Sequence, residues 1–416
     1  MDNTKLVRLA CYSTNVCMAI VGNMSPLLFL AFNREYGVSF SLLGALVLIN
    51  FFTQLLMDLA FSFFSHRFNV PLCLRIMPIM TVAGLLIFAL WPLVSDNVYL
   101  GFALGTVVFS ASSGFAEVLI SPTIAALPSD DPDREMSKTH SVYAWGVVGA
   151  VLYVTLFLNI FGDGAWQWMT VSFCAVPLFC FALFCRARLP ELKTQSRLGG
   201  TSGLVRDRRL WLCVCAIFLG AICELMMAQW SSGYIEEALG LPKALGDILG
   251  VAMFSVMLGL GRSLYGRIGK NIERTLILCA VGSVACYVVA ALSPIPAIGL
   301  IACALTGLAA SMMWPGSLVV VAKRFPKGGV FIYAIMAAGG DTGAALGPQI
   351  LGIVTDAVSG CRWGADLAQR LGITPESLGM RCGMLLGALA AALAVLVFLV
   401  IYRTRNDCPC DVGVDE

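Results

Sequence analysis

Charged side chains are scarce in this sequence of 416 residues. Asp, Glu, Lys and Arg together make up 12% of it, and hydrophobic residues make up 59%. A soluble domain is about 25% charged and about 45–50% apolar, because a surface that faces water needs charge. The composition therefore excludes an ordinary soluble protein. The 27 basic residues nearly balance the 25 acidic ones, so nothing indicates a nucleic-acid partner.

Motifs for metal binding and catalysis are also missing. The chain has two histidines, His66 and His140, and neither lies beside a Cys or carboxylate cluster with the spacing of metal ligands. It contains no nucleophile elbow and no phosphate-binding Gly-rich loop. We therefore expect no metal, no cofactor and no enzyme activity, and in particular no ATPase.

Apolar residues come in runs long enough to cross a bilayer. A membrane-spanning helix needs about 20 mostly apolar residues. The sequence therefore predicts an all-α membrane protein with 12 transmembrane helices, at approximately 6–31, 40–64, 74–94, 97–126, 140–162, 165–185, 210–235, 244–265, 275–293, 295–321, 329–356 and 379–402.

Lys and Arg are distributed unevenly around these segments. If the amino terminus is cytoplasmic, 22 of the 27 basic residues fall on the inner side of the membrane and five on the outer side. Cytoplasmic loops carry the excess of basic residues in membrane proteins. We therefore expect a multi-pass protein of the cell (plasma or inner) membrane, with both termini in the cytoplasm.

The longest polar stretch between predicted helices is 186–209, which carries seven Lys or Arg with Gly and Ser among them. Such a composition is typical of a linker. It divides the chain into an amino-terminal six-helix half, 1–185, a cytoplasmic linker, 186–209, a carboxyl-terminal six-helix half, 210–403, and a cytoplasmic tail, 404–416.

The two halves echo one another. The loop 261–270 after the eighth helix matches the loop 61–70 after the second, with Arg67 opposite Arg267. Parallel halves with a binding site near mid-membrane are a recurrent plan of transporters. We therefore expect the halves to be related by pseudo-symmetry.

This plan, the basic linker and the repeated loop resemble the major facilitator superfamily. The second loop matches the loop pattern of that family, except that Gly266 replaces an acid, and the first loop has Asn69 in place of a glycine. The resemblance implies two six-helix bundles and transport by alternating access. Asp58 lies about 9 Å from the end of its helix, where a structural role is the alternative to gating. Candidate gating residues are Asp58, Arg67, Gly261, Arg267, Gly269 and Lys270.

The fourth predicted helix has a closer resemblance, to the fucose permease branch. In that branch a glutamate stands five residues before a proline, as Glu117 does before Pro122. The segment 140–146, His-Ser-Val-Tyr-Ala-Trp-Gly, is similar to the branch as well. The resemblance implies a sugar-type solute and a role for Glu117 in proton coupling. The first helix departs from the branch, because it carries Asn15 and Asn23 instead of an acid.

Four acids lie well inside predicted helices: Asp58, Glu117, Glu224 and Asp341. We find no Lys or Arg at comparable depth and expect no fixed ion pairs that neutralise all four. Burial favours the neutral form of a carboxyl group, which suits a proton carrier. Glu117, Glu224 and Asp341 are therefore candidate proton-coupling residues, although a helix-packing hydrogen bond is an alternative role for Asp341.

Polar residues form stripes on three helices of the first half. Asn50, Gln54 and Asp58 recur every four residues, and Ser113 and Glu117 share one face of the fourth helix. The stripes predict a shared central cavity, while hydrogen bonds between helices are the alternative. Tryptophans can stack on a solute or mark the membrane interface. Candidate solute-binding residues are Asn23, Asn50, Gln54, Tyr143, Trp145, Gln229, Trp230 and Trp314.

Sixteen cysteines occur, most of them at apolar helix positions. There they are expected to behave as small hydrophobic residues. Cys361 and Cys382 are expected near the outer face, and the sequence leaves open whether they pair.

The leading hypothesis is a secondary transporter for a small polar solute, with H⁺ as the expected coupling ion and Na⁺ left open. We expect it to work as a monomer in the lipid bilayer. A proton-driven exporter of amphipathic or drug-like compounds is an alternative in the same fold. A membrane sensor or scaffold is an alternative of another class, and the shortness of the predicted soluble segments disfavours it.

Overall fold

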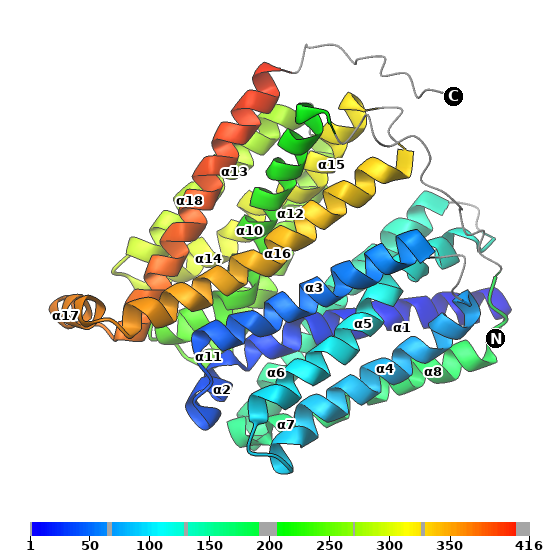
Figure 1. The fold of residues 1–416 in the computed structure, drawn as a ribbon, viewed down its shortest axis with the longest axis horizontal. Coiled ribbons are helices and arrows are strands. Elements are labelled where there is room, and N and C mark those ends of the chain that lie inside the picture. The colour runs from blue at the N-terminus through cyan, green and yellow to red at the C-terminus, as the bar shows by residue number, and fades with distance from the viewer. Residues whose placement is uncertain are drawn as a thin grey trace. The chain divides into compact units, whose positions relative to one another are not determined.

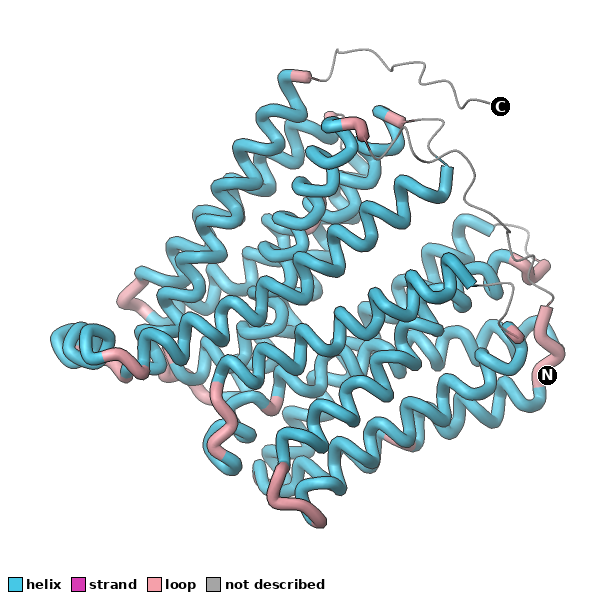
Figure 2. Tube along the Cα trace, viewed as in Figure 1, coloured by secondary structure: helices cyan, strands magenta, loops and turns pink. Residues whose placement is uncertain are grey.

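The computed structural model describes residues 2–64, 69–128, 132–190, 206–268, 271–325 and 329–404. Within these ranges the regular structure is helical, without strands (Figures 1 and 2). Most of the predicted linker, 191–205, and the tail from 405 onward lie outside the described residues.

The chain forms two compact units. Unit 1 comprises Met1–Val38 and Ile49–Arg197, and unit 2 comprises Ser39–Leu48 and Leu198–Glu416. The helices up to residue 190 are α1 (Asn3–Leu27), α2 (Phe29–Tyr36), α3 (Phe40–Phe64), α4 (Val70–Leu90), η2 (Trp91–Leu93), α5 (Val98–Ala125), α6 (Pro132–Phe161), η3 (Asp163–Ala165), α7 (Trp166–Phe173) and α8 (Ala175–Arg186).

The second part of the chain is helical in the same way. Its helices are α10 (Arg208–Glu237), α11 (Lys243–Leu245), η4 (Gly246–Ala252), α12 (Met253–Ile268), α13 (Ile272–Leu292), α14 (Pro296–Ala310), α15 (Met313–Arg324), α16 (Gly329–Ser359), α17 (Arg362–Leu371) and α18 (Pro375–Arg403). The segment η4 is a π-helix, which is a rare form that occurs mostly as a single turn within an α-helix.

The helices agree with the predicted membrane-spanning segments. Among the described residues, nine segments are long and apolar enough to cross a membrane. Two bent helix pairs, Asn3–Leu27 with Phe29–Tyr36 and Ile335–Ser359 with Arg362–Leu371, meet the same criterion when each pair is counted as one span. The remaining predicted segment, 140–162, lies in α6, whose apolar part is Trp145–Phe161. The prediction of an all-α, multi-pass membrane protein is therefore confirmed. The ten-residue helix α17 was not predicted.

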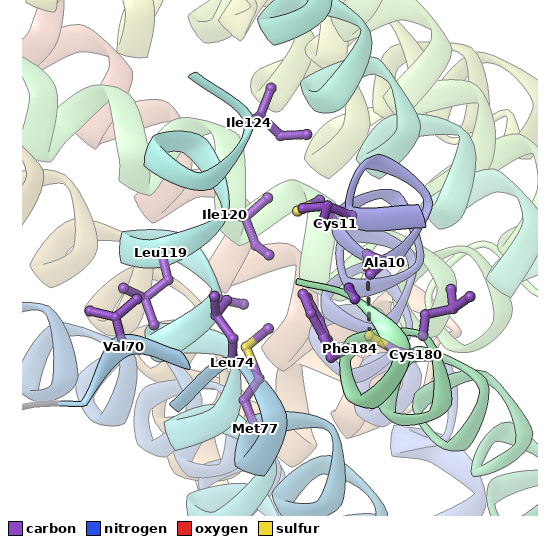
Figure 3. Close-up of a cluster of buried hydrophobic side chains, with 14 residues drawn as sticks. Ala10, Cys11, Val70, Leu74, Met77, Leu119, Ile120, Ile124, Cys180 and Phe184 are labelled. Carbon is purple, nitrogen blue, oxygen red and sulfur yellow. Dashed lines mark hydrogen bonds between the residues drawn. The ribbon is translucent and has the colours of Figure 1, made fainter. Parts of the chain in front are cut away.

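Unit 1 is held together by a core where α1, α4, α5 and α8 meet (Figure 3). Leu74, Ile120 and Phe184 are buried there with Cys11 and Cys180. The Cys180 thiol lies 3.0 Å from the Thr14 hydroxyl and 3.6 Å from the Ala10 carbonyl oxygen. Cysteine thus packs here as a small, weakly polar core residue.

The 14 cysteines within the described ranges are free thiols. Cys361 and Cys382 are among them, so the pairing that the sequence left open is not formed in this structure. The Cys361 thiol instead caps α17, because its Sγ accepts a hydrogen bond from the Gly364 backbone N–H at 3.2 Å.

Candidate solute and proton site

An ion pair lies inside unit 2, between α10 and α12. Nη2 of Arg262 donates to both carboxylate oxygens of Glu224, at 3.1 and 3.3 Å. The side chains are 43% and 12% exposed, respectively. Both residues lie in candidate membrane spans. The expectation that no basic residue lies at the depth of the acids is therefore wrong.

The direction of side chains on a helix explains the error. The sequence placed Arg262 at the cytoplasmic end of a helix that stops at residue 265, whereas α12 continues to Ile268. Side chains on a helix tilt toward its amino terminus. Arg262 therefore reaches back into the span, where Glu224 lies.

The backbone also holds the Arg262 guanidinium. Its Nε donates to the carbonyl oxygen of Ser311 at 3.1 Å. In a continuous helix that carbonyl would accept from residue 315, which is a proline and has no N–H. Arg262 supplies the missing donor at the break between α14 and α15.

Two glycines let α12 approach α14 closely enough for this bond. A Cβ on Gly261 would clash with the Ser311 side chain, and a Cβ on Gly307 would clash with the Phe254 carbonyl. Any larger residue at either position would separate the helices. Gly261 was predicted as a gating residue, and its position here indicates a packing role.

Trp314 and Asp341 lie close together on neighbouring helices of unit 2. The Trp314 ring packs against Gly340 of α16, where a Cβ would be within 2.9 Å of three ring atoms. Asp341 is the next residue of that helix, and both Trp314 and Asp341 are half-buried. An aromatic face and a carboxyl group thus lie beside the same turn of α16.

Gln229 and Trp230 are both buried in α10. Trp230 is fully buried, and its Nε1 donates to the Pro348 carbonyl oxygen at 2.9 Å. It is therefore part of the packing of unit 2. Gln229 is 5% exposed, and its Oε1 has no hydrogen-bond partner in the part of the chain that the structure describes. That oxygen remains available as an acceptor.

In unit 1 the polar stripes of α3 and α5 meet. Ser110 Oγ donates to Asn50 Oδ1 at 2.6 Å, and Gln54 Nε2 donates to the same oxygen at 3.1 Å. Asn50 is buried and Gln54 is half-buried. These hydrogen bonds join α3 and α5, as expected if the polar stripes bind helices to one another instead of lining a cavity.

Glu117 lies on α5, one helical turn beyond the buried Ser113. Its side chain is exposed, and no hydrogen bond or ion pair reaches it from the described residues. Ser113 and Thr14 help to line a cavity within unit 1 of about 10 Å³, which is roughly the size of one water molecule. Glu117 is not among the residues that line this cavity.

The remaining aromatic and amide candidates of unit 1 differ in their surroundings. Asn23 is half-buried and donates to its own helix, at the Ala19 carbonyl. The Tyr143 hydroxyl lies near Gly22 of α1. Trp145 is 72% exposed on the same face of α6 as the exposed Leu156. Lipid contact suits Trp145 better than solute contact.

The structure describes only some of the predicted gating residues. Asp58 is half-buried near the end of α3. Arg67, Gly269 and Lys270 lie outside the described residues, and Arg267 is placed only as part of the α12 backbone.

Sequence reasoning missed two further polar groups in unit 2. Asp247, in η4, is fully buried, accepts a hydrogen bond from Ser232 and pairs with Lys243 at 3.0 Å. Its spacing of four residues from Lys243, in an otherwise apolar segment, was an available signal.

Arg381 of α18 is the second missed group. Its Nη1 donates to the carbonyl oxygens of Ala291 and Ser293, at 2.9 and 3.3 Å, and its Nη2 donates to that of Ala238 at 2.9 Å. Ala238 follows α10, and Ala291 and Ser293 flank the end of α13. One guanidinium therefore caps two helix ends, where carbonyls lack partners within their own helix.

Comparison with known proteins agrees with this architecture. The family model described as the major facilitator superfamily matches residues 11–348. A bacterial homologue of the human lysosomal transporter Spinster, inward-facing and unoccupied, has a TM-score of 0.75 at 13% identity, over 99% of this chain and 100% of its own.

Two sugar symporters have the same fold. The D-xylose–proton symporter has a TM-score of 0.68 at 16% identity, over 94% of this chain and 96% of its own. A single-residue variant of the E. coli fucose:proton symporter FucP has a TM-score of 0.59 at 16% identity, over 96% of this chain and 99% of its own. No curated protein is significantly similar in sequence. With most of its length matched by the family model, this chain belongs to the major facilitator superfamily, a family of membrane transporters.

Proposed function

We propose that this chain is a secondary active transporter that carries a small polar solute of sugar type together with protons, by alternating access. It works in the cell membrane with both termini in the cytoplasm. The proposed moving parts are the halves 1–185 and 210–403, joined by the linker 186–209.

The observation that carries proton coupling is the state of Glu117. It lies within a candidate membrane span of 27 residues, is exposed, and receives no bond from the described residues. An ionised group at the centre of a bilayer costs about 2.5–3.5 kcal/mol on insertion scales. A proton removes this cost, so Glu117 alternates between a protonated and an ionised form as its surroundings change.

The sugar class rests on similarity. The fourth helix resembles the fucose permease branch, and solved structures of the same fold include a D-xylose–proton symporter and a fucose:proton symporter. Other structures of this fold are described as nucleoside and peptide transporters. Within unit 2, the groups suited to a hydroxylated solute are the Gln229 amide oxygen, which has no hydrogen-bond partner among the described residues, and the Trp314 ring as an apolar face.

Solute uptake into proteoliposomes with an imposed pH gradient tests the proposal. The wild-type protein is expected to accumulate a sugar when protons flow inward. The Glu117→Gln variant is expected to lose accumulation while it keeps solute exchange without a gradient, since the amide binds no proton. Glu273→Gln, at the first turn of α13, is the matched control and should accumulate as the wild type does.

Two results contradict the proposal. Accumulation by the Glu117→Gln variant equal to that of the wild type removes Glu117 from the coupling step. Movement of cationic dyes against the proton flow, without sugar uptake, identifies an exporter instead.

A further inference from the structure

We propose that Arg262 binds a carboxylate group of the transported solute, and that Glu224 releases Arg262 to the solute when Glu224 takes up a proton. The solute class is then a small hydroxylated monocarboxylate, such as a sugar acid. This inference rests on the proposed function, since it names the solute of the same coupled transport.

The geometry of the ion pair is the first step. Both oxygens of Glu224 share one nitrogen of Arg262, Nη2, at 3.1 and 3.3 Å. A guanidinium binds a carboxylate best through two parallel N–H groups on two nitrogens. Glu224 does not use that arrangement, so a better position for a carboxylate remains on Arg262.

The second step is the open side of the guanidinium. Arg262 carries five N–H donors. Nε is committed to Ser311 and Nη2 to Glu224, whereas Nη1 has no partner within the described residues. The Arg262 side chain is 43% exposed. The Nη1–Nη2 edge is therefore reachable by a solute carboxylate once Glu224 withdraws.

The third step is that Arg262 keeps its place without Glu224. Its Nε bond to the Ser311 carbonyl is fixed by Pro315, which removes the competing helical donor. The close contact of Gly261 with Ser311 holds the neighbouring backbone. The cation is therefore positioned by the fold, and Glu224 serves as an exchangeable partner.

Charge balance then sets the coupling. The ionised pair is neutral, and an added monocarboxylate would leave one excess negative charge at membrane depth. One proton on a Glu224 oxygen restores neutrality, so one proton binds with each solute anion. With one proton on Glu224, a dianion would leave the site with one excess negative charge. A neutral sugar would leave Arg262 without an anionic partner.

Among the described residues, no second charged side chain pairs with Glu224. Arg262 is the charged residue that contacts Glu224 in the described part of the chain. On the segments packed against α10, Lys243 pairs with Asp247, and Arg381 binds backbone carbonyls. Asp341, on α16, would add negative charge and so strengthen the need for a proton.

Calorimetry on the purified full-length protein in detergent tests this directly. Gluconate and glucose serve as a matched acid and neutral pair, and titration in two buffers of different ionisation enthalpy counts the protons taken up. We expect gluconate to bind more tightly than glucose, and the number of protons taken up per gluconate to be lower by about one in Glu224→Gln than in the wild type.

Variants of Arg262 give an independent readout. Arg262→Lys keeps the charge and removes the paired N–H geometry, and we expect gluconate affinity to fall at least about tenfold, which corresponds to about 1.4 kcal/mol. Arg274→Lys is the matched control, because Arg274 contacts Tyr402 on α18, and should bind gluconate as the wild type does.

Several results would overturn the inference. These are equal binding of glucose and gluconate, absence of proton uptake in the wild type, tighter binding of a sugar phosphate, and unchanged affinity in Arg262→Lys. Proton-driven uptake of glucose without gluconate in proteoliposomes also overturns it and leaves the proposed function standing. Proton-linked gluconate binding without any flux supports the inference and refutes the proposed function.

Discussion

The carboxylate of Asp356, near the end of α16, caps the start of α3 at Ser41. Its Oδ2 accepts hydrogen bonds from the Ser41 backbone N–H at 2.6 Å and from the Ser41 hydroxyl at 2.5 Å. Its Oδ1 accepts from the Phe40 N–H at 3.0 Å. The first N–H groups of a helix lack partners in the helix and carry its positive dipole end, so an anion fits this position.

Asp356→Asn is expected to lower stability by about 1–2 kcal/mol, because it removes the charge and one acceptor from this cap. The measurement is thermal unfolding in detergent. Asp366→Asn, on the exposed side of α17, is the control and should unfold at the wild-type temperature. Equal midpoints for both variants would show that the cap contributes little.

Asp247 and Lys243 are expected to act as a unit. Asp247→Leu leaves a partly buried cation and an unpaired Ser232, whereas the double variant with Lys243→Met removes both charges. A broken buried pair is costlier than an apolar replacement of both partners. The double variant should therefore be less destabilised than the sum of the single variants, by about 0.5 kcal/mol or more. Additive effects in a thermal-unfolding cycle would contradict this coupling.

Ser110→Ala tests the junction of α3 and α5. The change removes the shorter of the two hydrogen bonds to the buried Asn50 oxygen and leaves the one from Gln54, and we expect a loss of about 1 kcal/mol. Thr106→Val on the same helix is the control, since Thr106 is 1% exposed and its hydroxyl has no partner in the described part of the chain. That change is expected to be neutral or stabilising. A larger loss of stability in Thr106→Val than in Ser110→Ala, measured by thermal unfolding, would refute this account.

Arg381→Lys should destabilise unit 2 by about 1–3 kcal/mol, because an ammonium group does not span the three carbonyls that the guanidinium reaches. Arg370→Lys, on the exposed surface of α17, is expected to have no effect. Urea or thermal unfolding of both variants gives the comparison, and identical curves would contradict the capping role.

Membrane-spanning helices were the easiest feature to predict from this sequence. Runs of about 20 apolar residues have few other structural solutions, so each predicted segment corresponds to a helix or a bent helix pair. The helix α17 was missed because ten residues with several charges match no membrane-spanning pattern.

The polar groups were harder, because their partners lie far away in the sequence. The pair between Glu224 and Arg262 spans 38 residues and depends on where α12 ends. The sequence made Trp230 a candidate for stacking on a solute, but it did not show that its ring is fully buried within unit 2. Glu117 was a candidate that sequence reasoning could reach, because the resemblance depends on its local spacing to Pro122, and its role in proton coupling stays a prediction.

The capping of two helix ends by Arg381 has a consequence for biosynthesis. The ribosome makes α10 and α13 well before α18 emerges. Until then the carbonyls of Ala238, Ala291 and Ser293 lack the donors that Arg381 provides in the finished unit. A chain arrested before residue 381 therefore carries polar helix ends that depend on water, lipid headgroups or a membrane chaperone. We therefore expect the caps of α10 and α13 to be completed only when α18 is inserted.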